Sequence, residues 1–170
     1  NFLDQKNIHN TLDLYKKFPS NIKKNTVFKL HRTYYDLFNS FYYKKYFNNK
    51  KYHIVNNKNY IDKTKLFLFT YDSTGILENL CLGLPTICYF DSSFFHLNKN
   101  YTKVYKFLCE AKIIFFNEKK LLKHLEKYWD NIDLWWNDRK TQENISKFNK
   151  ILNNNFSEKK LNKIIKILKN

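Results

Sequence analysis

Short apolar runs alternate with amphipathic stretches along the middle of the chain, and this alternation is typical of a sheet covered by helices. Strands are predicted at the apolar runs 27–31, 52–55, 66–71, 86–90 and 112–116. Helices are predicted between and after them, at 34–47, 74–82, 100–110, 118–129, 138–153 and 158–168. Strand and helix therefore alternate from residue 27 to residue 129, which predicts an α/β fold with a Rossmann-like parallel sheet, flanking helices and a helical C-terminal tail.

The first 25 residues have a rough helical stripe that Pro19-Ser20-Asn21 interrupts. We expect a helix followed by a loop there, and we assign residues 1–25 to a linker from an N-terminal domain that lies outside this chain. Residues 26–170 are then one domain, which the length of 170 residues suits.

Leu66–Phe90 is the most informative stretch, because the only two glycines of the chain, Gly75 and Gly83, lie within it. Pro85 follows two residues after Gly83, just before the apolar run 86–90. In a chain with so few glycines and prolines, their clustering indicates backbone geometry that other residues supply poorly. Gly83 stands where a C-terminal helix cap belongs.

A binding site for an anion is predicted where the strand 66–71 gives way to the next helix. Ligands of parallel α/β sheets bind at the carboxyl ends of the strands, and free N–H groups at a helix start attract negative charge. Asp72 opens this junction, Ser73 and Thr74 add hydroxyl donors, and Gly75 allows a phosphate to approach the backbone. Together these residues suit the diphosphate of a nucleotide.

Glu78 lies one turn into the same predicted helix, four residues after Thr74 and five after Ser73. A capping box needs a spacing of three, so capping does not explain Glu78. A carboxylate at this place can accept hydrogen bonds from the two hydroxyls of a ribose. The plainer interpretation is that Ser73 caps the helix and that Glu78 only complements its dipole.

Several other polar residues follow the predicted strands. Arg32 ends the first strand and could clamp a diphosphate through paired contacts, although a surface arginine would look the same. His31 beside it has weaker support. His96 and Asp91 follow the strand 86–90 and could reach a sugar or a base, or could serve only the loop.

Composition adds little to this picture. The formal net charge is +16, but 31 basic residues include only two arginines, and the wealth of Lys, Asn, Ile, Phe and Tyr indicates AT-rich codon usage. We therefore do not expect nucleic acid as a partner, although a basic surface would attract anionic donors or lipids. Cys81, Cys88 and Cys109 form no CxxC pair and are expected to be buried free thiols.

The histidines give no metal signal, since His9, His53 and His124 lack metal-ligand spacing to one another or to the cysteines. We interpret them as structural. Trp135-Trp136 are expected to pack the C-terminal helices against the sheet or a partner domain, with contact to a sugar as the alternative.

The order of a strand, Ser73-Thr74-Gly75, Glu78 and Gly-x-Pro before a strand resembles the donor-binding element of two-domain GT-B glycosyltransferases. The segment TYDSTGILENLCLGLPTICYFD, the AKIIF strand, KLHR, and Trp135-Trp136 with Gln142 and Phe148 resemble bacterial surface-polysaccharide transferases of the O-antigen or capsule type. The likeness spans roughly residues 26–150. It departs at Leu97-Asn98, where the resemblance leads us to expect an arginine. If that arginine binds phosphate in the family, its absence either weakens the donor site or shifts the phosphate contact to Lys99 or Lys103.

The resemblance implies the donor-binding half of a glycosyltransferase, with Glu78 on the ribose and Ser73, Thr74 and Gly75 on the phosphates. It further implies a nucleotide-sugar as substrate, a glycan or lipid-linked acceptor, and a catalytic base in the other half. No cofactor or metal is expected, because no DxD motif occurs. The expected location is the cytoplasm, at the inner face of the membrane through peripheral association.

Three alternatives stay open on the sequence. A nucleotide-sugar 2-epimerase or a polyol-phosphate transferase would use similar Ser/Gly-plus-acid elements. A non-catalytic module would bind a nucleotide-sugar without turnover. A basic nucleic-acid-binding protein would show an affinity that falls steeply with salt.

Overall fold

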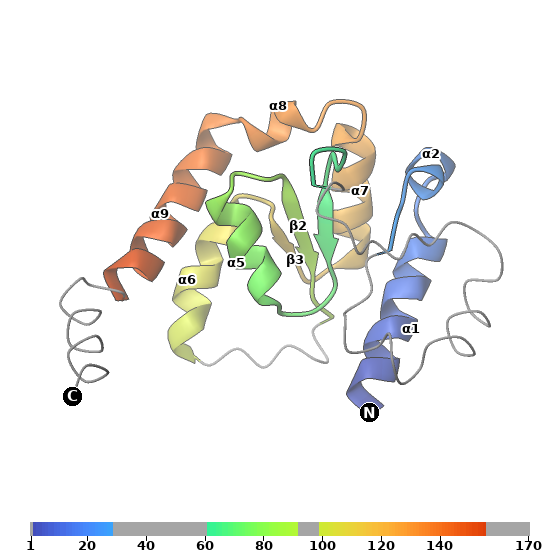
Figure 1. Ribbon diagram of the computed structural model, residues 1–170, viewed down its shortest axis with the longest axis horizontal. Coiled ribbons are helices and arrows are strands. Elements are labelled where there is room, and N and C mark those ends of the chain that lie inside the picture. Colours follow the sequence, from blue (N-terminus) through green and yellow to red (C-terminus); the bar gives the residue numbers. More distant parts are fainter. Residues whose placement is uncertain (1, 29–60, 92–98, 156–170) are drawn as a thin grey trace. The chain divides into compact units, whose positions relative to one another are not determined.

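The structure is a computed structural model that describes residues 2–28, 61–91 and 99–155 (Figure 1). The strand predicted at 52–55 and the helices predicted at 34–47 and 158–168 lie outside the described residues. The strand predicted at 27–31 lies largely outside them too, and Val27 and Phe28 are not in a strand. The domain boundary expected after residue 25 stays a prediction.

Three parallel strands form the sheet of the described region: β1 (Phe67–Phe69), β2 (Thr86–Tyr89) and β3 (Ile114–Phe115), in the order β1-β2-β3. The helix α5 (Thr74–Cys81) connects β1 to β2, and α6 (Lys99–Glu110) precedes β3. Parallel pairing with helical crossovers confirms the predicted Rossmann-like α/β fold. All three strands are shorter than their apolar runs.

The C-terminal part is helical, as predicted. It contains α7 (Glu118–Tyr128), α8 (Asp133–Trp136) and α9 (Arg139–Asn155), of which the single-turn α8 was not predicted. Figure 1 shows α9 descending from α8 alongside α6, and the rings of Tyr105 on α6 and Phe148 on α9 lie 6.2 Å apart. This contact packs α9, in the C-terminal tail, against α6, one of the helices that flank the sheet.

The N-terminal stretch forms α1 (Phe2–Lys16) and, after Pro19, the short helix α2 (Ser20–Lys24). The predicted helix is confirmed, but the stretch expected to be a loop contains a further helical turn. The chain divides into two compact units, one made of residues 1–17 with 65–170 and the other of Phe18–Thr64. α1 thus belongs to the unit of the sheet, whereas α2 belongs to the second unit.

The core of the sheet unit consists of aliphatic and aromatic side chains from β2, β3 and the helices that pack on them. Its most buried members are Leu14, Ile87, Cys88, Leu108, Ile113, Leu121 and Phe148. β1 is only half-buried, although its apolar run predicts full burial. It stands at the end of the strand order among the described residues, so one of its flanks has no strand neighbour there.

The cysteines are free, as predicted, but they are not uniformly buried. Cys88 is fully buried on β2, Cys109 is half-buried and Cys81 is exposed at the end of α5. Burial raises the pKa of both the Cys88 and the Cys109 thiols, which keeps them in the unreactive protonated form. The expectation of burial was therefore wrong for Cys81, because the amphipathic α5 turns that position away from the sheet.

Two tryptophans attach α8 to the sheet. Trp135 Nε1 donates a hydrogen bond of 2.8 Å to the carbonyl of Ala111, and Trp136 Nε1 donates one of 3.0 Å to the carbonyl of Gly83. Gly83 and Ala111 precede β2 and β3, so both bonds lie at the amino ends of these strands. The predicted packing role is confirmed. Both side chains are 4% exposed, so the alternative of sugar contact is wrong for this structure.

Gly83 closes α5 in the way that its position predicts. Its φ of +69° is the left-handed conformation that glycine adopts without strain. The N–H of Gly83 bonds to the carbonyl of Leu80, and the N–H of Leu84 bonds to that of Asn79. This pair of bonds is a Schellman motif, which satisfies the last carbonyls of the helix.

Candidate functional site

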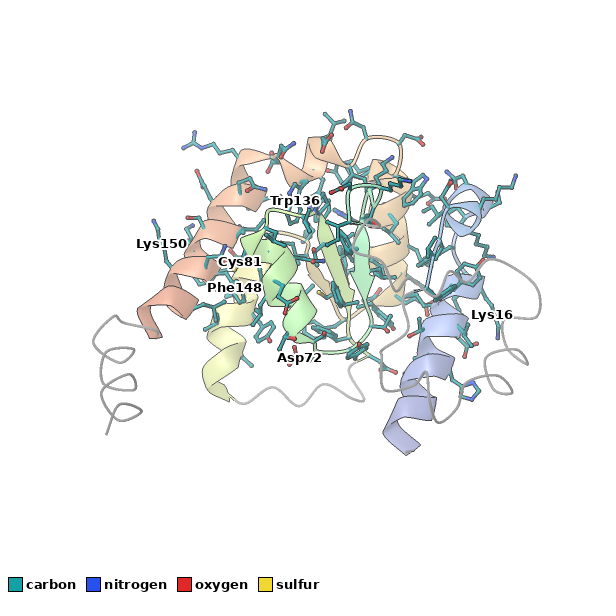
Figure 2. The ribbon with its side chains drawn as sticks, in the orientation of Figure 1. Lys16, Asp72, Cys81, Trp136, Phe148 and Lys150 are labelled. Atoms are coloured by element: carbon teal, nitrogen blue, oxygen red, sulfur yellow. The ribbon has the colours of Figure 1, made fainter. Side chains whose placement is uncertain are left out.

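The predicted anion site lies at the carboxyl end of β1. After Phe69 the chain leaves the sheet through residues 70–72, and Ser73 then starts α5 as its N-cap. Figure 2 shows Asp72 beside the first turn of this helix, where it is exposed. Asp72, Ser73, Thr74 and Gly75 therefore lie together at a helix start on the carboxyl edge of the sheet, as the sequence predicts, and parallel α/β sheets bind ligands at that edge.

Ser73 is the cap of α5, which supports the plainer interpretation of this residue. Its extended backbone and its Oγ, which accepts from the N–H of Gly75 at 3.3 Å, are typical of an N-cap. Its carbonyl also accepts from the N–H of Ile76. A hydroxyl that accepts one bond keeps its hydrogen to donate, so capping leaves Ser73 able to contact an anion.

Thr74 offers the most accessible donors at this helix start. The residue is exposed, and neither its N–H nor its hydroxyl has a hydrogen-bond partner among the described residues. The first N–H groups of a helix have no acceptor within the helix, and the helix dipole gives this end a partial positive charge. An anion would find both donors of Thr74 and the hydroxyl of Ser73 on the same turn.

The structure gives Gly75 a packing reason, while the close approach of a phosphate to its backbone stays a prediction. A Cβ built at Gly75 would lie 3.1 Å from Cε1 and 3.3 Å from Cζ of Phe69. The ring at the end of β1 therefore packs under the first turn of α5, and this fixes the height of the helix start above the strand. The composition of the chain singled out Gly75, but the ring that crowds it is visible only in the structure.

Glu78 is exposed on α5, on the side away from the buried Ile76 and Leu80. Among the described residues its carboxylate has no hydrogen-bond or ion-pair partner. It therefore neither caps the helix nor balances a lysine of the described region. The structure leaves it available at the distance of one helical turn from Thr74, about 6 Å along the axis.

A side-chain contact from α1 holds the end of β1. Oγ1 of Thr11 and Oγ1 of Thr70 are 2.6 Å apart, a hydrogen-bond distance within the sheet unit. Thr70 stands two residues before Asp72, so this bond anchors the start of the loop that leads into α5. The sequence analysis did not single out either threonine, because no local pattern relates positions so far apart in the chain.

Exposed aromatic side chains also follow the strands at this edge, and they were missed. Tyr71 follows β1 and is 45% exposed, and Phe116 follows β3 and is 41% exposed. The ring of Phe116 lies 6.4 Å from that of Phe90, just after β2. Large apolar rings in water at a ligand-binding edge are candidates for contact with a sugar or a base. Their signal in the sequence was hidden by the general wealth of aromatics.

The remaining predicted residues divide into two groups. Asp91 is half-buried at the carboxyl end of β2, as predicted. Arg32, His31 and His96 lie outside the described residues. Lys99 begins α6, and both it and Lys103 lie on that helix.

His124 is structural, as predicted. Its ring packs against Phe115, Tyr128 and Trp135 at centroid distances of 5.2, 4.8 and 4.8 Å, and its Nε2 is buried without a hydrogen-bond partner. Burial, helped by the nearby charges of Lys112 and Lys127, lowers the pKa of this histidine to about 4. It is therefore neutral at physiological pH.

Two further observations concern metal binding and surface depressions in the described region. No group of three or more His, Cys, Asp or Glu residues within it could hold a metal ion. A shallow depression lies near the start of α9, between Glu110, Asp138 and Lys147, and it contains none of the predicted site residues. Asp138 uses its carboxylate to cap α9 there through the N–H groups of Lys140 and Thr141.

Comparison with known protein families shows which family the chain belongs to. Residues 2–165 match the model described as LIC12162 family transferase. The chain belongs to this transferase family. Neither the curated proteins nor the solved structures contain a match. Family membership makes the protein a transferase and leaves the transferred group to be inferred from the site.

None of the helices in the described parts of the LIC12162 family chain is long and apolar enough to cross a membrane.

Proposed function

We propose that this LIC12162 family transferase binds a nucleotide-sugar at the start of α5 and transfers the sugar in the synthesis of a surface polysaccharide. The observation that carries the proposal is the pairing of an open helix start at Ser73-Thr74 with the unpartnered carboxylate of Glu78 on one accessible helix. A nucleoside diphosphate has both an anionic diphosphate and a ribose with two hydroxyls, and it therefore needs both features.

The division of roles follows from the chemistry of each group. Thr74 and Ser73 donate hydrogen bonds to the diphosphate, and the helix dipole stabilises the negative charge that grows on it as the sugar departs. Glu78 accepts hydrogen bonds from the ribose hydroxyls. Asp72 lines the same donor site in this proposal, and Tyr71 or Phe116 offers a ring for the sugar or base. The donor contacts expected of Arg32 and His96 stay predictions, because both residues lie outside the described part of the chain.

Membership in a transferase family bears on the alternatives. A 2-epimerase moves no group between molecules, so it fits this family poorly. In our proposal the acceptor is a glycan or a lipid-linked glycan, a further domain supplies the catalytic base, and no metal or cofactor takes part. Identification of the transferred group as sugar or polyol phosphate distinguishes glycosyl transfer from the nearest rival reaction.

The test is a thermal-shift screen of nucleoside diphosphates and nucleotide-sugars against the wild-type chain and Glu78→Ala. We expect one nucleotide to raise the melting temperature of the wild type. Because a ligand present at 100 times its dissociation constant stabilises a protein by about 2.7 kcal/mol, the shift is easily measured. In Glu78→Ala the shift for that nucleotide should largely disappear.

Glu126→Ala is the matched control, because Glu126 is also an exposed glutamate on a helix, α7, away from the start of α5. Both variants lose one negative charge relative to the wild type. A general electrostatic effect would therefore change the nucleotide-induced shift in melting temperature equally in the two variants. An equal response of the two variants, or the absence of a shift with any nucleotide in the wild type, would contradict the proposal.

A further inference from the structure

The three strands of the sheet are followed by the same order of residue types, an aromatic residue and then a carboxylic acid or an amide. The pairs are Tyr71-Asp72, Phe90-Asp91 and Phe116-Asn117. Their aromatic members are level in the register, because each lies two positions beyond one of the cross-strand partners Phe69, Cys88 and Ile114. We name the two levels the aromatic rung (Tyr71, Phe90 and Phe116) and the polar rung (Asp72, Asp91 and Asn117).

The aromatic rung continues the sheet beyond its strands. The N–H of Phe90 donates to the carbonyl of Phe115 at 3.0 Å, and the ring centroids of Phe90 and Phe116 lie 6.4 Å apart. Phe90 in the middle of the rung is buried, whereas Tyr71 and Phe116 at its two ends are exposed. Because neighbouring strands are about 4.8 Å apart, a rung across three strands measures roughly 10 Å, which is long enough to contact a sugar ring.

The exposed rings are not explained by composition. The chain is 19% aromatic, so rings are expected throughout its core. Among the aromatic side chains whose burial the structure describes, however, only Tyr71 and Phe116 are exposed. Burial of a large apolar side chain is favourable wherever a fold provides cover for it. The fold leaves two rings in water at one level of the carboxyl edge, which indicates a ligand with an apolar face there.

The polar rung contains a carboxylate that the described contacts do not explain. Asn117 caps α7, since its Oδ1 accepts from the N–H of Lys120 at 3.0 Å. Asp72 is exposed, has no hydrogen-bond or ion-pair partner among the described residues, and leaves the capping of α5 to Ser73. It lies two residues before Thr74, where its charge opposes a diphosphate. A carboxylate at this place favours a neighbouring group that donates hydrogen bonds.

The order of the groups in a nucleotide-sugar matches the order of the residues at this edge. In the proposed donor site the diphosphate lies at Thr74, and the ribose lies at Glu78, one helical turn further along α5. The base is attached to the ribose, whereas the sugar is attached to the opposite end of the diphosphate. Asp72 precedes the helix start and therefore lies on the side of the sugar.

We propose that the aromatic and polar rungs form the subsite for the transferred group, and that this group is an uncharged hexose. A pyranose has apolar C–H faces that pack on aromatic rings, and its hydroxyls donate to carboxylates. A uronate would bring a further negative charge close to Asp72 and Asp91, and like charges disfavour binding. This inference rests on the proposed nucleotide-sugar site, and it adds the class of sugar and the residues that select it.

The experiment measures dissociation constants by isothermal titration calorimetry. The probes are UDP, GDP, ADP, CDP and dTDP, the glucose conjugate of each, and the glucuronate conjugate of the nucleotide that binds. The test variants are Asp72→Asn and Phe116→Ser, and Tyr71→Ser replaces the second if it is not folded. Asp133→Asn and Leu134→Ser are the matched controls, because they change an exposed acid and an exposed apolar residue on α8, at the amino edge. The melting temperature without ligand checks that each variant is folded.

Asp72→Asn should weaken binding of the glucose conjugate by about tenfold, because a neutral amide replaces a charged acceptor. Its affinity for the nucleoside diphosphate alone should not fall, since a like charge has been removed. The wild type should bind the glucose conjugate at least tenfold more tightly than the glucuronate conjugate, and Asp72→Asn should reduce this preference. Phe116→Ser should weaken the glucose conjugate several-fold and leave the diphosphate unchanged. The two controls should alter neither affinity.

The outcomes separate this subsite from the nucleotide site on which it rests. If the wild type binds none of the diphosphates or conjugates, both proposals are wrong. If a diphosphate binds but Asp72→Asn changes neither the affinity for the glucose conjugate nor the preference over glucuronate, only the subsite is overturned, and Asp72 merely complements the dipole of α5. An equal loss of affinity for the diphosphate and its conjugate in Phe116→Ser would assign that ring to the base and overturn its assignment to the sugar.

Discussion

The indole Nε1 of Trp136 donates a hydrogen bond of 3.0 Å to the carbonyl oxygen of Gly83, a residue 53 positions earlier in the chain. This bond joins the C-terminal helices to the turn that closes α5. The start of α5 is the candidate donor site, so one helix connects the site at the carboxyl edge of the sheet to a structural anchor at the amino edge.

Replacement of Trp136 by Phe should lower the free energy of unfolding by about 1–2 kcal/mol. The ring remains, but the hydrogen bond to Gly83 and part of the buried indole are lost. Urea denaturation followed by circular dichroism measures the loss. Trp129→Phe is the control, because the Trp129 side chain is only half-buried and its indole N–H bonds to no described residue. A larger loss in the control would contradict this account.

Gly83→Ala should destabilise the protein by about 1 kcal/mol, because an L side chain is strained at a φ of +69°. A Cβ there meets nothing within 4 Å, so the destabilisation comes from backbone strain and not from a steric clash. Lys112 has a φ of 58°, and Lys112→Gly should therefore stabilise the protein by roughly 0.5–1 kcal/mol. Thermal denaturation of both variants checks the opposite signs, and equal signs would refute the strain argument.

Acidification should destabilise the fold through His124. Its pKa is about 4 in the folded protein and about 6.5 when unfolded, so between these values the unfolded state binds more protons. The stability due to neutral His124 is fully present above pH 6.5 and is lost as the pH falls toward 4. Urea denaturation at pH 7.5 and 5 should show a smaller loss for His124→Phe than for the wild type. Identical losses would mean that His124 is accessible to protons in the fold.

Substitutions at Ser73 separate its capping role from its proposed contact with the donor. Ser73→Ala removes the acceptor for the Gly75 N–H and should cost about 1 kcal/mol of stability. Ser73→Asp retains a good N-cap, so its melting temperature without ligand should be near that of the wild type. Its carboxylate would repel a diphosphate, and the nucleotide-induced shift should vanish. A retained shift in Ser73→Asp would place the diphosphate elsewhere.

The sequence predicted the local features well, because each depends on neighbours in the chain. The alternation of apolar runs and amphipathic stretches gave the strands and helices from β1 to α9, with the exception of the single-turn α8. Gly83 was predicted to close α5, and the structure confirms this with a Schellman motif. The helix start at Ser73-Thr74 and its place at the end of a strand were also predicted.

The roles of the site residues were less predictable, since a residue type does not reveal its partners. Only the structure shows that Ser73 caps α5, that the ring of Phe69 crowds Gly75, and that Glu78 has no partner among the described residues. The exposed Tyr71 and Phe116 were missed, because exposure depends on what the fold places over a side chain.

The sequence by itself determined the order of the elements, the helix ends and the residue types gathered at the start of α5, since these follow from periodicity and backbone preference. The tertiary structure decided which distant positions meet: Trp136 with Gly83, Trp135 with Ala111, and Thr11 with Thr70. These contacts join residues far apart in the chain, and they form only when the packed core brings their elements together.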